Sequence, residues 1–354
     1  MRVQLTALAV AAGATAFITH MARADSVADF YKGKTVEMQI GYSAGGGYDV
    51  YARTVAQYLA DHIPGKPTVI AKNAPGAGSL KLTNWLYSAA PKDGTVIGAV
   101  GRGAAFEPLI GNTKAQFDAT KFNWLGSANN EVSVCVAWHT SGVKTFEDTL
   151  TKELVVGGTG PSADTDVFPQ VIAAVFGAKL KLVTGYPGGN DINLAMERGE
   201  VTGRCGWSWS SVKSTRGHWL SEKKISVFVQ LALKKHADLP KIPLIMDMAK
   251  SREQTQMLRL VFARQSMGRP YLLPPGVPAD RVAALRKAFD DTMKDKAFLA
   301  EVQKRDLELD PVTGSEIQDL VKEAIATDKA VVDKVAAILS KAKGSGKKGK
   351  AKKQ

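Results

Sequence analysis

Short apolar runs alternate with amphipathic stretches along most of this chain. The runs are rich in β-branched residues and predict strands at 36–41, 67–71, 95–100, 133–138, 154–157, 180–184 and 225–233. Between most of them, apolar residues recur at the spacing of one helix face, which predicts helices over 50–62, 80–89, 165–176 and 191–198. Strands that alternate with helices are typical of parallel sheets covered by helices. The pattern therefore predicts an α/β fold.

The last part of the chain departs from this alternation. Three successive helices are predicted over 278–294, 296–305 and 315–340, and Pro278 is favoured near the start of the first. We expect these helices to pack against a sheet rather than to continue one. The 316 residues from 25 to 340 exceed one ordinary hydrophobic core, so two domains are expected.

The first 24 residues predict export. Arg2 precedes an uncharged apolar stretch over 5–18, and Ala22-Arg23-Ala24 matches a small-x-small cleavage site just before Asp25. An uncleaved membrane anchor is the alternative, but the stretch falls short of the roughly 20 residues that span a bilayer. We therefore expect a signal peptide over 1–24 and a soluble, exported protein.

The net charge of +13 is unevenly distributed. The tail over 341–354 holds seven lysines and no acidic residue, and the segment over 1–24 adds two arginines, so residues 25–340 carry only +4. A tail of Gly, Ser and Lys is too polar to bury, which predicts disorder over 341–354. No aromatic residue separates its lysines, so nucleic acid is not an expected partner; attraction to an anionic envelope surface and simple solubility both stay open.

The cysteines and histidines predict neither a metal site nor a cofactor. Cys135 and Cys205 lie far apart without metal-type spacing such as CxxC. Export permits a disulfide, but both lie in apolar strand-like segments, so two buried thiols are the default expectation. The histidines after the signal segment show no HxxxH or HxH pair and are expected to be surface or capping residues; they are His62, His139, His218 and His236.

Glycine-rich turns follow four of the predicted strands, at 42–49, 101–103, 157–162 and 185–190. The first leads into a helix whose first backbone N–H groups lack helical partners and therefore favour an anion. A tight turn with Asp49 as the helix cap is the structural alternative. Ligands of open α/β sheets bind beyond the carboxyl ends of the strands, so together the turns favour a small anion held between two sheets.

No catalytic constellation is predicted. The turn over 157–162 lacks the Gly-Lys-Ser/Thr ending of a P-loop, and no GxGxxG is followed by an acidic residue at nucleotide-binding distance. Asp164 and Asp166 form an acidic pair, but at the start of a predicted helix they are better explained as capping residues. The chain is therefore not expected to be an enzyme.

Five segments, in this order, resemble a known family. They read Tyr42-Ser43-Ala44-Gly45-Gly46-Gly47-Tyr48-Asp49, Lys72-Asn73-Ala74-Pro75-Gly76-Ala77-Gly78, Ala90-Pro91-Lys92-Asp93-Gly94-Thr95, Leu239-Pro240-Lys241-Ile242-Pro243 and Pro274-Pro275-Gly276-Val277-Pro278. Over about residues 30–335 the chain resembles the solute-binding receptors of tripartite tricarboxylate transporters, which include the Bordetella-type uptake receptors.

This resemblance implies a two-lobed periplasmic binding protein of the Venus-flytrap type. Such a receptor is usually a monomer that binds a small organic acid and delivers it to membrane permease subunits without chemistry. The implied crossover strands lie near 132–138 and 227–233. The first lobe would comprise 25–132 plus 230–340, with the C-terminal helices packed on it, and the second lobe 133–229.

The resemblance also implies how an acid is held. The family grips a carboxylate with an AGGxxD loop and a facing loop of the second lobe. Ser162 is the counterpart in the facing loop, although no histidine follows it as in the family. The first loop is matched by Ala44, Gly45, Gly46 and Asp49, while Tyr42 and Ser43 replace the usual Phe and Pro.

The second lobe differs more from the family, which often has an aspartate near the second crossing. This chain has Arg204 and Trp207 there, which favours a more anionic or aromatic ligand. Arg204 facing the cleft and Arg204 in a structural ion pair are both open, because one residue of register reverses its direction. The ligand-binding candidates are Tyr42, Ser43, Ala44, Gly45, Gly46, Asp49, Arg102, Gly160, Ser162, Gly188, Gly189, Arg204 and Trp207.

Two other functions stay open beside a transport receptor. One is an exported α/β enzyme that acts on a similar acid, which turnover of the bound acid would reveal. The other is a sensory ligand-binding protein that partners a membrane kinase, which a pull-down with envelope proteins would reveal.

Overall fold

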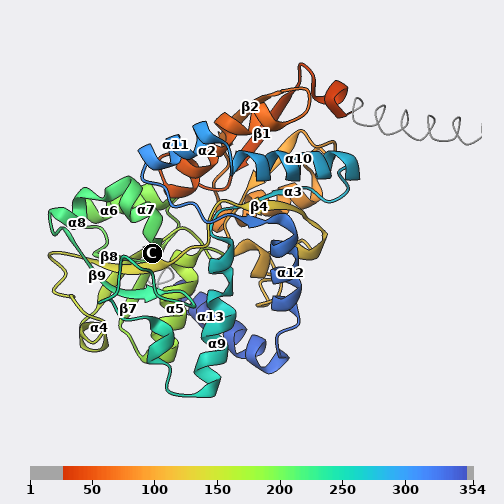
Figure 1. The fold of residues 1–354 in the computed structure, drawn as a ribbon. Helices are drawn as coiled ribbons and strands as arrows, with labels where there is room; N and C mark the ends of the chain where they lie inside the picture. Colours follow the sequence, from red (N-terminus) through yellow and green to blue (C-terminus); the bar gives the residue numbers. More distant parts are fainter. Residues whose placement is uncertain (1–26, 349–354) are drawn as a thin grey trace, which may run out of the picture.

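The computed structural model describes residues 27–348 of the chain, so the predicted signal peptide over 1–24 lies outside the described residues. Two α/β sheets form the framework, each with helices packed on it (Figure 1). The predicted two-lobed α/β architecture is confirmed. No helix between residues 27 and 348 is both long and apolar enough to cross a membrane.

The first sheet has the strand order β11-β4-β10-β3-β1-β2. Its strands are β1 (Thr35–Ile40), β2 (Thr68–Asn73), β3 (Val96–Ala99), β4 (Asn123–Ser127), β10 (Pro270–Leu273) and β11 (Val312–Thr313). β1 pairs in parallel with β2 and β3, whereas β10 lies antiparallel between β3 and β4. The sheet is therefore mixed and not parallel as predicted, because a strand from late in the chain inserts between two early ones.

The second sheet has the order β7-β6-β8-β5-β9. Its strands are β5 (Ser133–Trp138), β6 (Leu154–Gly158), β7 (Leu180–Thr184), β8 (Gly203–Ser208) and β9 (Ile225–Leu231). β6 pairs in parallel with β7 and β8, while β5 is antiparallel to β8 and β9. This sheet is also mixed, since β5 and β9 carry the chain into and out of it.

Helices cover both faces of each sheet. α2 (Gly47–His62), α10 (Ala279–Thr292) and α11 (Lys296–Lys304) share an apolar cluster with one face of the first sheet. α3 (Leu80–Ser88) and α12 (Gly314–Ile325) share a cluster with its other face. On the second sheet, α5 (Asp164–Phe176) and α9 (Arg252–Phe262) pack on one face, and α6 (Gly189–Glu197) and α7 (Trp209–Arg216) pack on the other.

Short elements complete the fold. They are α4 (Asp148–Thr151), α8 (His218–Ser221), and the 3-10 helices η1 (Ala77–Ser79), η2 (Ala104–Phe106), η3 (Ala119–Lys121), η4 (Ile245–Met248) and η5 (Ala263–Met267).

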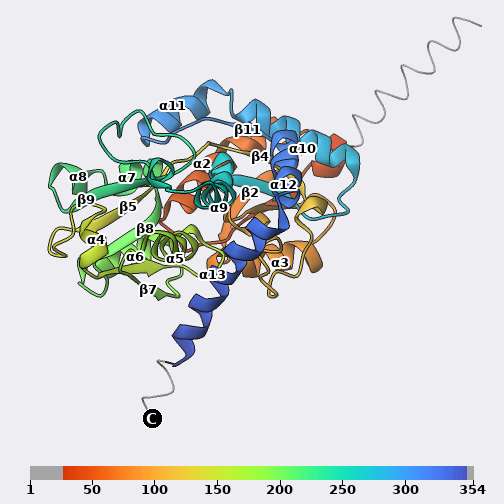
Figure 2. The ribbon, with the colours of Figure 1, turned by 90° about the horizontal axis from the view of Figure 1, so that it is seen from below.

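The predicted helix over 315–340 is two helices, because the chain breaks after α12 and restarts at α13 (Lys329–Lys348). The Asp328 carboxylate accepts the N–H of Ala330 at 2.7 Å, as a helix N-cap does. The C-terminal helices α10 to α12 pack on the first sheet as predicted, whereas α13 packs with α5 and α9 on the second sheet. Viewed from below, α13 runs out from the body toward the C-terminus (Figure 2). The helix continues to Lys348, where disorder was predicted from residue 341.

The two cysteines form a disulfide between β5 and β8, so the prediction of two buried thiols is wrong. Cys135 and Cys205 are separated by 70 residues in sequence, but their strands are antiparallel neighbours and both side chains face the same apolar cluster. Spacing along the chain gives no signal for such a pair. The predicted lobe boundaries, after 132 and after 229, stay a prediction.

Candidate functional site

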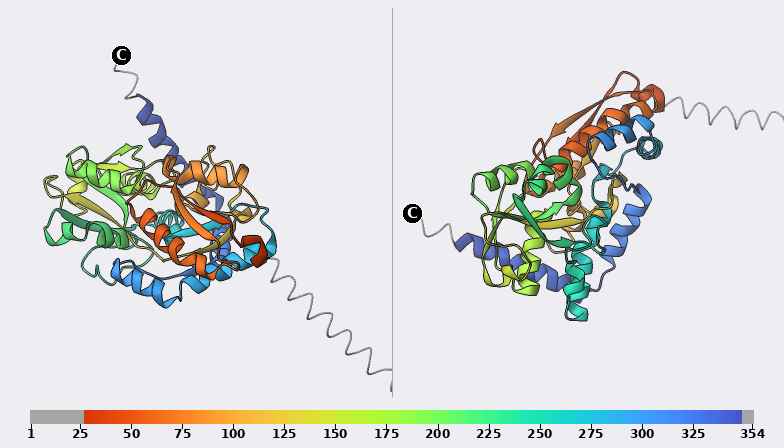
Figure 3. Two further views of the ribbon diagram at one scale, coloured as in Figure 1. Left: turned by 90° about the horizontal axis from the view of Figure 1, so that it is seen from above. Right: turned by 60° about the vertical axis from the view of Figure 1, so that its left-hand side comes forward.

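The four glycine turns meet at one cavity between the two sheets. The turns after β1 and β3 come from the first sheet, and those after β6 and β7 come from the second (Figure 3, left). The cavity has a volume of about 50 Å³. Its lining includes six of the predicted site residues: Tyr42, Gly46, Arg102, Gly189, Arg204 and Trp207. It also includes residues that were not predicted, among them Tyr48, Thr159, Asp164, Ser208, Ser211 and Arg269.

Four helices begin at this cavity. α2 starts at Gly47, α5 at Asp164, α6 at Gly189 and α7 at Trp209, and residues of each start line the cavity or adjoin its lining. In none of the four does the side chain of the N-cap residue accept a first-turn N–H, although in α7 Glu131 Oε1 accepts the N–H of Ser210 at 3.4 Å. Unpaired N–H groups and the positive end of the helix dipole both attract anions. The backbone alone therefore favours a negative ligand at this place.

Arg102 lies in the cavity wall, but all three nitrogens of its guanidinium donate hydrogen bonds to the protein. Its Nε donates to Asp164 Oδ2 at 2.5 Å and its Nη2 to Ser133 Oγ at 2.8 Å. Its Nη1 donates to Ser208 Oγ at 3.1 Å and to the carbonyl of Gly268 at 3.3 Å. Burial alone would lower the pKa of Arg102, but Asp164, Tyr48 and Glu131 together raise it above its usual value. Arg102 therefore mainly links the two sheets through its hydrogen bonds and its ion pair.

Arg204 is held from one side and open on the other. Its Nη1 donates to the carbonyl of Gly189 at 3.0 Å and to Asn193 Oδ1 at 2.9 Å, and its guanidinium lies 4.5 Å from the ring centre of Trp207. Its Nε is buried without a hydrogen-bond partner. The alternative of a structural ion pair does not hold, because no carboxylate within residues 27–348 forms one with Arg204. The guanidinium of Arg204 stacks on the indole of Trp207, so that face of the indole is not free to stack on an aromatic ligand.

The charge of Arg204 is uncompensated by the protein. Burial, together with the positive charges of Arg216 and Arg269, lowers the pKa of Arg204 to about 9. A guanidinium remains protonated at neutral pH even so, and the lowered pKa reflects how unfavourably its charge is held without an anion. An anionic group in the cavity would relieve this cost.

Arg269 was missed at the sequence level because no glycine turn marks it. Its Nη2 donates to Ser211 Oγ at 2.7 Å and lies 3.3 Å from Glu131 Oε2, while its Nη1 donates to Ser208 Oγ at 3.0 Å. Its guanidinium lies 4.7 Å from the ring centre of Tyr48. Arg269 thus has an acidic partner, and Arg204 is the lining arginine that lacks one.

Asp49 shapes the first turn and does not line the cavity. The helix cap is Gly46 and not Asp49 as predicted, since α2 starts three residues earlier than expected. Asp49 Oδ2 accepts the N–H of Gly45 at 3.0 Å, and its Oδ1 accepts the amide of Asn73 at 2.8 Å. Ala44 and Gly45 form the exposed tip of this turn. Neither residue lines the cavity.

Ser162 and Ser43 join the two sheets. Ser162 Oγ lies 2.7 Å from the carbonyl oxygen of Ala77 and 2.8 Å from that of Gly78, and donates toward them. Ser43 Oγ donates to Asp191 Oδ2 at 2.5 Å. Both hydroxyls therefore lie beside the cavity rather than in its lining.

The predicted residues Gly160 and Gly188 allow the two sheets to approach closely. A Cβ at Gly160 would lie 2.5 Å from the backbone of Ala77, and a Cβ at Gly188 would lie 2.2 Å from Ser43 Oγ. Neither glycine lines the cavity. A larger residue at either position would collide with these atoms and hold the sheets apart.

One enzyme-like motif was missed from the sequence. Gly41-Tyr42-Ser43-Ala44-Gly45 has the GxSxG spacing of a nucleophile elbow and lies between β1 and α2. A serine nucleophile needs a base within hydrogen-bond reach. The hydroxyl of Ser43 is instead bonded to Asp191, and no histidine within residues 27–348 forms a hydrogen bond with it. The motif therefore lacks its catalytic partner.

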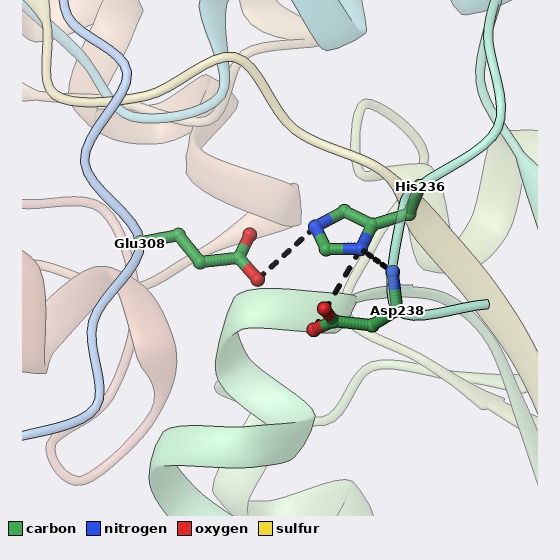
Figure 4. Close-up of side chains that lie close together, drawn as sticks. All are labelled: His236, Asp238 and Glu308. Carbon is green, nitrogen blue, oxygen red and sulfur yellow. Dashed lines mark hydrogen bonds and ion pairs between the residues drawn. The ribbon is translucent and has the colours of Figure 1, made fainter.

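A second polar cluster lies outside the cavity, where His236, Asp238 and Glu308 offer ligand atoms within 4.8 Å of one another (Figure 4). His236 Nδ1 accepts the N–H of Asp238 at 3.0 Å, which fits the expectation of a capping residue. Lys213 Nζ lies 2.7 Å from Asp238 Oδ2 and 2.6 Å from Glu308 Oε1. This ammonium group pairs with both carboxylates, so the cluster is an ion-pair network.

Comparison with known sequences gives a distant relative. No protein-family model matches the chain. A protein of Cupriavidus necator described as "UPF0065 protein in gbd 5'region" is 24% identical over 321 residues, which cover 88% of this chain and 90% of the relative.

Comparison with solved structures gives similar folds over nearly the whole length. The periplasmic binding protein BugD has a TM-score of 0.69 at 18% identity and covers 88% of this chain and 98% of its own. MatC from Rhodopseudomonas palustris, with bound malate, has a TM-score of 0.67 at 17% identity over 86% of this chain and 99% of its own. A TctC solute-binding protein from Polaromonas has a TM-score of 0.56 at 17% identity, over 86% and 99%. These neighbours confirm the fold of a two-lobed periplasmic binding protein and the resemblance found in the sequence.

Proposed function

We propose that this protein is a periplasmic solute-binding receptor that captures a small organic carboxylate between its two sheets and delivers it to a tripartite-type membrane transporter. The observation that carries the proposal is the cavity itself. Four helix starts without a capping N-cap side chain meet there with the guanidinium of Arg204, and no carboxylate within residues 27–348 pairs with that arginine. A carboxylate is the ligand group that satisfies both.

Entry of such a ligand requires the sheets to move apart. A cavity of about 50 Å³ is far smaller than ordinary ligand pockets, which measure roughly 300–1,000 Å³. The hydroxyl contacts of Ser162 and Ser43 would break on opening and re-form on closing. Hinge closure around a ligand is a known mode of such movements, and it presents a different surface to a partner in each state.

The neighbours support this function and its location. MatC is described with bound malate, and BugD is described as a periplasmic binding protein. The signal-like segment over 1–24 agrees with a periplasmic receptor. We assign the ligand contacts to Gly46, Gly189 and Arg204, with Tyr42 as a further wall. Arg102 links the two sheets, and the remaining predicted residues shape the turns or join the sheets.

Thermal unfolding with a panel of acids tests the proposal. The protein is unfolded and refolded to remove copurified ligand and is then melted with malate, adipate, citrate or benzoate. A ligand that binds only the folded state raises the melting temperature. At 100 times its Kd, it raises the free energy of unfolding by about 2.7 kcal/mol. At least one acid is expected to do so. No shift with any acid contradicts the proposal, and turnover of a bound acid would favour an enzyme instead.

A further inference from the structure

We infer that the Cys135–Cys205 disulfide, together with the glycine bulge beside it, positions Arg204 for anion binding. This inference rests on the proposed function, because it assigns a role within the same cavity. It concerns how β8 directs its side chains, which a regular strand could not do.

Arg204 and Trp207 are three residues apart, so in a regular strand they would face opposite sides of the sheet. They nevertheless stack on each other, with the guanidinium 4.5 Å from the ring centre of the indole. The strand register gives the reason. Val134 pairs with Trp207 and Val136 pairs with Arg204, so β8 uses one residue more than β5 over this interval. The extra residue is a β-bulge, which re-aims neighbouring side chains.

Gly206 makes this bulge possible. Its φ is +72°, in the left-handed region that glycine adopts without cost. A Cβ at Gly206 would also lie 2.6 Å from the backbone of Asp164, where α5 begins. The bulge therefore requires glycine both for its own backbone and for the close approach of α5, which brings Asp164 to Arg102.

The disulfide lies at the bulge, on the opposite face of the sheet. Cys135 falls between the two paired valines of β5, and Cys205 falls between Arg204 and Gly206 of β8. Both sulfurs are fully buried in the cluster shared with α5 and α9. A bulge interrupts the ladder of backbone hydrogen bonds between two strands, so their relative position is less restrained there. The covalent link restores that restraint directly behind Arg204.

The consequence for the ligand is geometric. A guanidinium binds a carboxylate best when its two donors meet the two oxygens in one plane. Contacts with Gly189, Asn193 and Trp207 fix the plane of the Arg204 guanidinium. Each of these contacts depends on where the bulge places the Cα of Arg204. If the bulge shifts, Arg204 keeps its charge, but its guanidinium is no longer oriented toward the ligand.

A double-mutant cycle separates positioning from ordinary stabilisation. Binding of the tightest acid among malate, adipate, citrate and benzoate is measured by calorimetry. The variants are Arg204→Gln, Cys135→Ala/Cys205→Ala, and their combination. In the otherwise wild-type protein, Arg204→Gln is expected to weaken binding by about tenfold to about hundredfold. Without the disulfide, the same substitution is expected to weaken binding by less than about threefold.

Leu285→Ala is the matched control, because Leu285 is fully buried in the core of the first sheet, away from the bulge. This variant lowers the melting temperature, and in its background Arg204→Gln should retain its full effect. If the disulfide-free protein does not fold, Gly206→Ala with the disulfide intact takes its place in the cycle, since it strains the same bulge.

The outcomes distinguish the two proposals. If the wild-type protein binds none of the acids, the proposed function fails and this inference fails with it. If the wild-type protein binds and Arg204→Gln costs the same in every background, the proposed function stands and only the positioning role is overturned. A loss of the Arg204 effect in the Leu285→Ala background also overturns it, because general destabilisation would then explain the result.

Discussion

Two arginines line the cavity from opposite sheets, and their surroundings differ. Arg102, on the first sheet, is bonded through all three guanidinium nitrogens and pairs with Asp164, which raises its pKa. Arg204, on the second sheet, has two neutral acceptors on one nitrogen and a buried Nε without a partner, and burial lowers its pKa to about 9. The difference separates a charge that the protein neutralises from one that it leaves for a ligand.

This contrast predicts opposite effects of substitution on stability and binding. Removing a paired buried charge leaves its partner unsatisfied and destabilises the fold. Removing an unpaired buried charge relieves a desolvation cost and should leave the fold intact. The same contrast appears in two carboxyls of α5, because Asp164 pairs with Arg102 whereas Asp166 is buried among neutral donors.

The largest effect is expected at Arg102. Arg102→Gln breaks the short buried pair with Asp164, leaves that carboxylate only the 3.6 Å pair with Arg264, and should lower the free energy of unfolding by about 3–5 kcal/mol. Urea unfolding measures this value. Arg305→Gln is the control, because Arg305 forms an exposed pair with Glu301 and should change stability by less than about 1 kcal/mol. Equal effects of the two substitutions would break the comparison.

The next effect concerns pH and Asp166. Burial raises the pKa of Asp166 from 3.8 to about 6, so between these values the folded state holds a proton that the unfolded state has lost. Stability contributed by this group therefore falls as pH rises from about 4 to about 6, by about 3 kcal/mol in total. Asp166→Asn keeps an acceptor for the N–H of Gly160 and removes this titration.

Urea unfolding of the wild-type protein and of Asp166→Asn across this pH range gives the test. The difference in the free energy of unfolding, wild type minus variant, should decrease with rising pH and level off above about pH 7. A difference that is flat or that increases would show that Asp166 is already stabilised as a carboxylate.

A smaller effect on free energy, but a large one on binding, is expected at Arg204. Arg204→Gln should weaken carboxylate binding by about 1.5–3 kcal/mol, since a hydrogen bond to a charged group is lost, and should leave the melting temperature unchanged or higher. Calorimetry and thermal unfolding measure the two quantities. Arg198→Gln is the matched control on the same sheet, because Arg198 is 68% exposed and forms only a 3.8 Å pair with Glu200. If Arg204→Gln lowers stability without weakening binding, Arg204 has a structural role like that of Arg102.

The smallest effect is expected at Ser162. Ser162→Ala removes the hydroxyl that contacts the carbonyls of Ala77 and Gly78 across the two sheets, which is worth about 1 kcal/mol. Because the contact joins the two sheets, the loss should appear as a several-fold weaker carboxylate affinity in calorimetry. Ser221→Ala, at an exposed hydroxyl at the end of α8, should have no such effect.

Sequence alone predicted the strands that precede glycine turns and the meeting of those turns at one ligand site. Local composition carries this information, since β-branched runs and glycines mark both. The strands β4, β8, β10 and β11 are absent from the predicted set. β8 reads Gly203-Arg204-Cys205-Gly206-Trp207-Ser208, and its bulge and glycines hide the alternation that marks a strand.

The site was predicted less completely than the fold, because its remaining parts depend on long-range pairing. Arg269 lies just before β10 and reaches the cavity only because β10 inserts between β3 and β4. The acid that occupies Arg102 comes from α5 of the other sheet. The register of β5 and β8 decides the direction of Arg204, and a register cannot be derived from one strand's own residues.

The break at Asp328 has a mechanical consequence. The chain runs between the two sheets after β4 and again before β10, and α12 and α13 provide a third connection at 326–328. Two rigid bodies joined at two points can rotate freely about the line through those points, whereas a third joint off that line stops the rotation unless it bends. If the sheets separate to admit a ligand, the capped break between α12 and α13 must bend with them, so we expect a substitution that stiffens it to limit the opening.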